Sequence, residues 1–166
     1  MTKDEHPPEM VDAMFLHGLI GRPSPNSPIP ATLVTRLKEN RLESSVAIPP
    51  PERPWSQPEW ERIEAGHLSQ DMDDKWHGYV ENDRLYLHRS WTGDRLYEAQ
   101  FQSEGEVQRI IAAVGTTYER RSAMRPETDS LQLEVIIETV FLNVWNKDKI
   151  DRLLEYAREE GFLPPR

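Results

Sequence analysis

The chain has 166 residues, a net charge of −9 and no cysteine, which fits one modest domain and excludes disulfides, thiolate nucleophiles and cysteine-ligated metal sites. The acidic balance makes nucleic acid an unlikely partner, because non-specific binding to DNA or RNA requires a basic face. No apolar run reaches the roughly 18 residues of a membrane span and the start lacks the basic residues of a secretory signal, so we expect a cytoplasmic protein with no membrane contact.

The first fifty residues are predicted to form a helical, proline-rich appendage and linker (1–50), ahead of an α+β domain at 51–166. Apolar residues at helical spacing predict a short helix over residues 8–20. A second helix is expected over residues 31–43. The sequence "IPPPERP", residues 48–54, indicates a stiff extended linker between the two parts.

After the linker, the pattern changes from helical to alternating. A short helix is predicted over residues 57–66. The period of two then predicts three strands, over residues 75–81, 84–91 and 95–101. Residues 106–114 fit a fourth strand, with a helix as the rival interpretation. Closely spaced turns are typical of an antiparallel meander, so we expect a sheet of three to four strands.

The C-terminal region is predicted to be helical. Residues 129–146 carry a wide apolar stripe, and a further amphipathic helix follows up to Gly161. An antiparallel sheet needs a cover on its apolar face, and these helices are the expected cover. The fold class predicted is α+β, an antiparallel β-meander packed against C-terminal helices with a short helical N-terminal appendage.

The stretch "LYLHRSWTG", residues 85–93, gathers groups suited to ligand binding at the end of a strand. Arg89 is a planar fork that matches phosphate or carboxylate. Neutral donors follow it, namely the hydroxyls of Ser90 and Thr92 and the N–H of Gly93. A phosphate-bearing ligand is therefore a candidate for this strand end.

The same strand end also suggests general acid–base catalysis. His88 is a candidate general acid or base, oriented by Glu98 or Asp74. Either Trp76 or Trp91 offers a ring that can stack on a nucleobase.

Strand alternation limits both ideas. Arg89 points away from His88 and Ser90 on a regular strand, so they converge only if a bulge or the following turn re-aims them. The structural alternative is that the cluster only stabilises the sheet, with Trp91 in the core and Arg89 paired with Glu98 or Glu81 on a neighbouring strand.

Metal-binding patterns are weak. The acidic run at residues 71–74 lacks the spacing of an EF-hand loop, and the five histidines lack HxH or HxxxH spacing. We therefore expect neither a metal nor a cofactor.

The stretch "DDKWHGYVENDRLYLHRSWTGDRLYEAQF", residues 73–101, resembles a family of small, largely uncharacterised bacterial proteins marked by D-K-W, a hairpin and L-Y-x-H-R-S-W-T-G. The family module is also associated with macro-domain proteins, which process ADP-ribose. The resemblance spans residues 55–145 approximately. The chain departs from the family pattern at residues 77–78 and 94–95. These differences weaken the expectation of a shared ligand more than the expectation of a shared fold. The matching residues, which the resemblance implies form the shared site, are Lys75, Trp76, Tyr86, His88, Arg89, Ser90, Trp91, Thr92 and Gly93.

Three functions follow as hypotheses. The first is a binding module for a phosphate-bearing small molecule, nucleotide or ADP-ribose-like as the resemblance implies. The second is a hydrolase acting on such a ligand. The third is an acidic protein-interaction or immunity-type protein, in which Met10, Met14 and Phe15 of the first helix dock on a protein partner or on a second copy.

Overall fold

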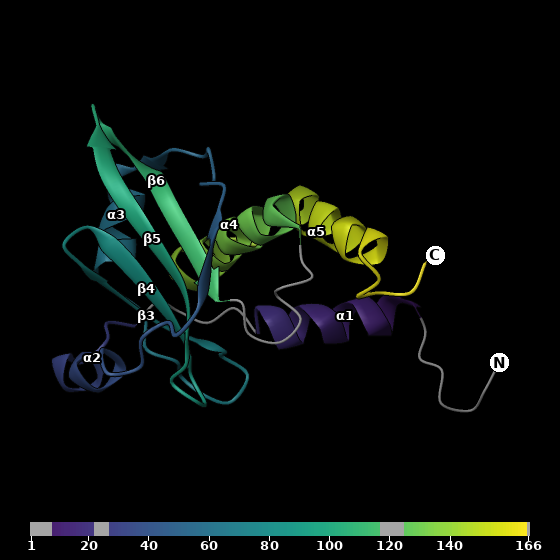
Figure 1. The fold of residues 1–166 in the computed structure, drawn as a ribbon, viewed down its shortest axis with the longest axis horizontal. Coiled ribbons are helices and arrows are strands. Elements are labelled where there is room, and N and C mark those ends of the chain that lie inside the picture. The colour runs from purple at the N-terminus through teal and green to yellow at the C-terminus, as the bar shows by residue number, and fades with distance from the viewer. Residues whose placement is uncertain (1–7, 22–26, 117–124, 166) are drawn as a thin grey trace.

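The computed structural model describes residues 8–21, 27–116 and 125–165, and it has the α+β architecture that the sequence predicts (Figure 1). The helices in these stretches are α1 (Pro8–Leu19), α2 (Ala31–Leu37), α3 (Gln57–Glu64), α4 (Pro126–Leu142) and α5 (Lys147–Glu159). The strands are β1 (Ser45–Ile48), β2 (Trp55–Ser56), β3 (Trp76–Glu81), β4 (Arg84–Arg89), β5 (Arg95–Glu104) and β6 (Val107–Thr116). In the same stretches, every helix is too short or too polar to cross a lipid bilayer.

The six described strands belong to one antiparallel sheet, with β1, β6, β5, β4 and β3 in that order and β2 also paired with β6. β3 to β6 form the predicted meander, and β6 is a strand rather than the rival helix. The sheet is larger than the three to four strands expected. β1 and β2 pair with opposite ends of β6, with Ala47 facing Val114 and Trp55 facing Gln108. The prolines between them lack the N–H that a ladder needs, so the chain leaves the sheet there and returns.

The boundary predicted after residue 50 falls between these two strands of one sheet. β1 lies in the stretch predicted as an appendage, and its Ile48 is buried in the same cluster as Trp55. The helix predicted over residues 31–43 was too long, since α2 ends at Leu37. The amide Nδ2 of Asn40 donates to the Gly93 carbonyl at 3.1 Å, which holds this segment against the β4–β5 turn instead of continuing the helix.

Local sequence signals explain the tight turn between β3 and β4 and the helix ends. Asn82 and Asp83 both have positive φ, at 54° and 60°, as a two-residue hairpin turn requires. Ser56 forms a capping box at the start of α3. α4 begins at Pro126, earlier than the predicted 129, because proline suits the first helical turn. Asn143, in the left-handed region, ends it.

Two apolar clusters meet on α4. One face of the sheet packs against α3 and α4, through side chains that include Trp55, Trp60, Trp76, Leu85, Leu87, Tyr97, Phe101, Ile137 and Phe141. The second cluster joins α1 to α4 and α5, and includes Leu19, Ile20, Val135, Leu153 and Leu154. An ion pair between Arg158 and Asp12 adds to this contact, and Figure 1 shows α1 beside α5. The N-terminal helix is therefore packed onto the C-terminal helices.

Gly78 of β3 lies directly under Phe141 of α4. A β-carbon at this position would be 2.4 Å from Cζ of Phe141, which is fully buried. We predict that Gly78→Ala lowers the free energy of unfolding by about 1–3 kcal/mol, because the ring has to move in a packed core. Urea unfolding measures the change. Gly18→Ala is the control, since nothing lies within 4 Å of a β-carbon there. Equal stability of Gly78→Ala and the wild type would contradict this packing.

Candidate functional site

The motif at residues 85–93 is divided between the two faces of the sheet. Leu85 and Leu87 point into the core, so alternation puts Tyr86 and His88 on the opposite face. The register between β4 and β5 shifts at Leu87 and His88, and β4 ends at Arg89. Beyond this point the chain lines a shallow depression of about 350 Å³, whose walls are Gly18, Lys75, Arg89, Ser90, Trp91 and Thr92.

Arg89 binds the C-terminal end of α1. Its Nη2 donates to the Gly18 carbonyl at 3.0 Å, and its Nη1 lies 3.5 Å from the Leu19 carbonyl. The guanidinium also lies over the Trp76 ring, 4.5 Å from its centroid, and the Trp76 indole N–H donates to the same Leu19 carbonyl at 3.1 Å. The last carbonyls of a helix carry partial negative charge, so a cation there is stabilising. Arg89 and Trp76 therefore hold α1 against the sheet.

The other polar groups of the depression are also bonded within the protein. The Ser90 hydroxyl donates to the Asp74 carbonyl at 2.9 Å, and the Ser90 N–H donates to the Lys75 carbonyl at 3.0 Å. Lys75 Nζ donates to the Met72 carbonyl at 3.0 Å. These bonds tie the loop before β3 to the end of β4.

The turn after β4 closes on itself. The Thr92 hydroxyl oxygen accepts from the Asp94 N–H at 3.2 Å, and the Gly93 N–H donates to the Arg89 carbonyl at 2.8 Å. Gly93 has a φ of +76°, which residues other than glycine rarely adopt. Its carbonyl accepts from both Asn40 and His88.

His88 is buried in an environment that favours its neutral form. It is fully buried, and its Nδ1 donates to the Gly93 carbonyl at 2.7 Å, which places the ring proton on Nδ1. Nε2 lies 3.5 Å from Nε of Arg95 and accepts from it. Burial is the main cause that lowers the pKa of His88 to about 4, and Arg95 lowers it further, against the opposing effect of the Gly93 bond.

The two carboxylates expected to orient His88 have other partners. Glu98 binds Arg84 at 2.7 Å and Arg95 at 3.2 Å. The Asp74 carboxylate lies 2.8 Å from Nε2 of His67, and both of these side chains are buried. Sequence reasoning missed the His67–Asp74 pair because a seven-residue spacing across a loop matches no metal or catalytic pattern. The described residues contain no group of three or more His, Cys, Asp or Glu side chains arranged to hold a metal ion.

Trp91, like Thr92 of the same motif, is exposed to solvent. Its side chain is 66% exposed and that of Met72 is 63% exposed, more than the other large apolar side chains in the described residues. Met10 and Met14 are exposed on α1, at 47% and 57%. Phe15, predicted to share their role, instead packs against the second apolar cluster.

Comparisons with known proteins add nothing to this geometry, since we found no match to a protein-family model, a curated protein or a solved structure. The family suggested by the motif stays a prediction.

We predict that Arg89→Ala loosens α1. Removing a charge-assisted hydrogen bond to the helix end is expected to lower its local stability by about 1–2 kcal/mol, so its backbone amides should exchange roughly tenfold faster. Hydrogen exchange read residue by residue measures this, with the exposed Arg36→Ala as control. Unchanged exchange in α1 would contradict the assigned role.

We predict that His88 makes the fold sensitive to mild acid. Its pKa is about 4 when folded, against an ordinary value of 6.5, so the unfolded chain takes up the proton first. Its contribution to stability is complete above pH 6.5 and is lost as the pH falls to about 4, by roughly 3 kcal/mol. In His88→Asn, whose amide can still donate to Gly93, unfolding curves across this range should depend less on pH. The same dependence in both proteins would overturn the prediction.

Proposed function

We propose that this chain is an acidic interaction module that binds a basic, apolar segment of a partner protein. The proposed contact is made by Met10, Met14, Met72 and Trp91, here named the Trp–Met surface. The observation that carries the proposal is the exposure of Trp91, 66%, in a motif whose neighbouring polar groups are bonded within the protein.

The members of the Trp–Met surface lie on adjoining elements. Trp91 and Gly18 line the same depression, and Met14 is one turn before Gly18 on α1. Lys75 lines that depression too and donates to the carbonyl of Met72. Tryptophan is a frequent energetic centre of interfaces, and methionine adapts to partners of varied shape.

The charge of the chain selects the kind of partner. The net charge is −9, and in the sequence Asp71 and Asp73 flank Met72 while Asp94 closely follows Trp91. An acidic protein attracts basic partners and repels acidic ones during encounter. A segment with lysine or arginine beside apolar side chains matches the net charge of the chain and the apolar side chains of this surface.

We predict that an amphipathic helical peptide of leucine and lysine binds the full chain, measured by isothermal titration calorimetry. Trp91→Ala should weaken binding by about tenfold or more, as loss of a central tryptophan does at interfaces. The matched control is Trp145→Ala, which removes a tryptophan that is 47% exposed and lies after α4.

A leucine–glutamate peptide of the same pattern tests the charge preference. Equal affinity for the two peptides would contradict the proposal. So would an affinity for the leucine–lysine peptide that Trp91→Ala leaves unchanged.

A nucleotide or ADP-ribose-like ligand is the second candidate for the same depression. Its support is that Lys75, Arg89 and Trp91 lie around one hollow of about 350 Å³, a size within the range of small-molecule sites. Calorimetric titration with ADP-ribose distinguishes the two candidates. Saturable binding heat with the wild type that is absent with Trp91→Ala would favour the small molecule. Hydrolysis is not carried forward, because His88 is buried and both of its ring nitrogens face groups of the protein.

A further inference from the structure

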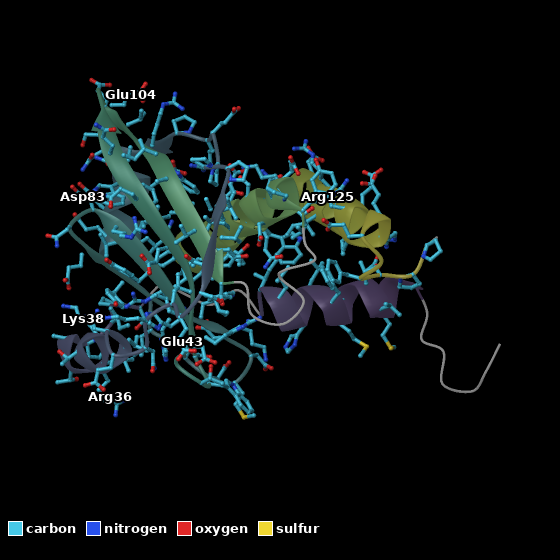
Figure 2. The ribbon with its side chains drawn as sticks, viewed as in Figure 1. Arg36, Lys38, Glu43, Asp83, Glu104 and Arg125 are labelled. Carbon is cyan, nitrogen blue, oxygen red and sulfur yellow. The ribbon has the colours of Figure 1, made fainter. Side chains whose placement is uncertain are left out.

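We infer that the sheet face opposite the core, beside α2, binds a small molecule through an oxyanion, a phosphate or a carboxylate. The site is a depression of about 320 Å³, here named the Arg41 depression, lined by the cations Lys38, Arg41 and Arg95 together with two tyrosines and two glutamates. In Figure 2, Lys38 is labelled beside α2. This site is separate from the Trp–Met surface and does not depend on the function proposed for it.

Positive charge exceeds negative charge in the Arg41 depression. Glu98 is shared by two guanidinium groups, since it binds Nε of Arg84 at 2.7 Å and Nη1 of Arg95 at 3.2 Å. Lys38 and Glu81 form an ion pair that is neutral as a unit. Among the residues that line the depression, the three cations Lys38, Arg41 and Arg95 stand against the two carboxylates of Glu81 and Glu98, which leaves an excess of one positive charge.

Arg41 carries this excess. Its side chain is exposed, and within the described parts of the chain it has no hydrogen-bond or ion-pair partner. It lines both the Arg41 depression and a second depression of about 290 Å³ on the other side. In a chain of net charge −9, a guanidinium that carries a local excess of positive charge and has no partner among the described residues is a place for an anion from outside the protein.

The floor of the depression is rigid. The side chain of Arg95 is only 8% exposed, its Nη2 donates to the Tyr79 hydroxyl at 3.1 Å, and its guanidinium lies 4.5 Å from the centroid of the Tyr86 ring. Tyr79 and Tyr86 stack with centroids 4.9 Å apart. Arg95 therefore supplies a fixed positive charge beneath the site.

The position of Arg41 is set by the hydrogen bond of the preceding residue, Asn40. Asn40 donates to the carbonyl of Gly93 at 3.1 Å, so the turn that ends the motif also holds the segment that carries Arg41. A guanidinium fork binds phosphate and carboxylate oxygens in pairs, and the Tyr86 hydroxyl is a further donor in the lining. A volume of about 320 Å³ suits a small metabolite rather than a polymer.

The test titrates the ¹⁵N-labelled full chain with pyrophosphate and, separately, with citrate, read by two-dimensional NMR. We expect saturable shifts of the Arg41 side-chain N–H and of the backbone amides of Lys38 and Tyr86. Arg41→Gln should weaken binding about tenfold, as loss of a charge-assisted bidentate contact does. Arg36→Gln, which removes another exposed arginine from the neighbouring helix, should bind as the wild type does. Saturation by one probe alone identifies whether phosphate or carboxylate is the group recognised.

Two results would overturn the inference. One is the absence of saturable shifts with both probes, and the other is equal affinity of Arg41→Gln and the wild type. Trp91→Ala should bind pyrophosphate unchanged, so failure at the Arg41 depression is distinguishable from failure of the Trp–Met surface.

Discussion

The carbonyl end of α1 is held by Arg89 and Trp76, and the exposed surface proposed for binding depends on that contact. The hydrogen bond from the Arg89 guanidinium to the helix end contributes about 1–2 kcal/mol, whereas an exposed contact such as that of His17 and Asp73 contributes about 0–1 kcal/mol. The Arg89 contact therefore outweighs the other polar contacts of α1 with the loop before β3. It holds Gly18, near the end of α1, in the same depression as Trp91.

The motif consequently serves two faces of the sheet in different ways. On one side, Arg89 and Ser90 bond to the backbone of neighbouring segments and leave Trp91 exposed. On the other, buried His88 accepts from Arg95 and donates to Gly93, and both of these partners help to build the Arg41 depression. Burial and the adjacent Arg95 guanidinium lower the pKa of His88 and favour its neutral form. Because both ring nitrogens bond within the protein, this half of the motif is a structural support.

The sequence was sufficient for features that depend on local patterns. Period-two alternation predicts the meander, and the Asn82–Asp83 pair predicts the turn, because both depend on neighbouring residues. β1 and β2 were missed, since two short strands flanking prolines carry little alternation. Arg89 bonds to Gly18, about 70 residues away in the sequence, so residue spacing could not predict this contact. The position of Arg41 beside Arg95 depends on the fold of the whole chain and could not be predicted from spacing either.

We propose that the motif separates stability from binding, with Arg89 stabilising the fold and the exposed Trp91 contacting a partner. The most direct test compares the free energies of unfolding of Arg89→Ala and Trp91→Ala in urea. We expect Trp91→Ala to stay within about 0.5 kcal/mol of the wild type, as exposed substitutions do, and Arg89→Ala to lose about 1–2 kcal/mol. A Trp91→Ala protein destabilised as much as Arg89→Ala would show that Trp91 stabilises the fold, and would contradict this division of roles.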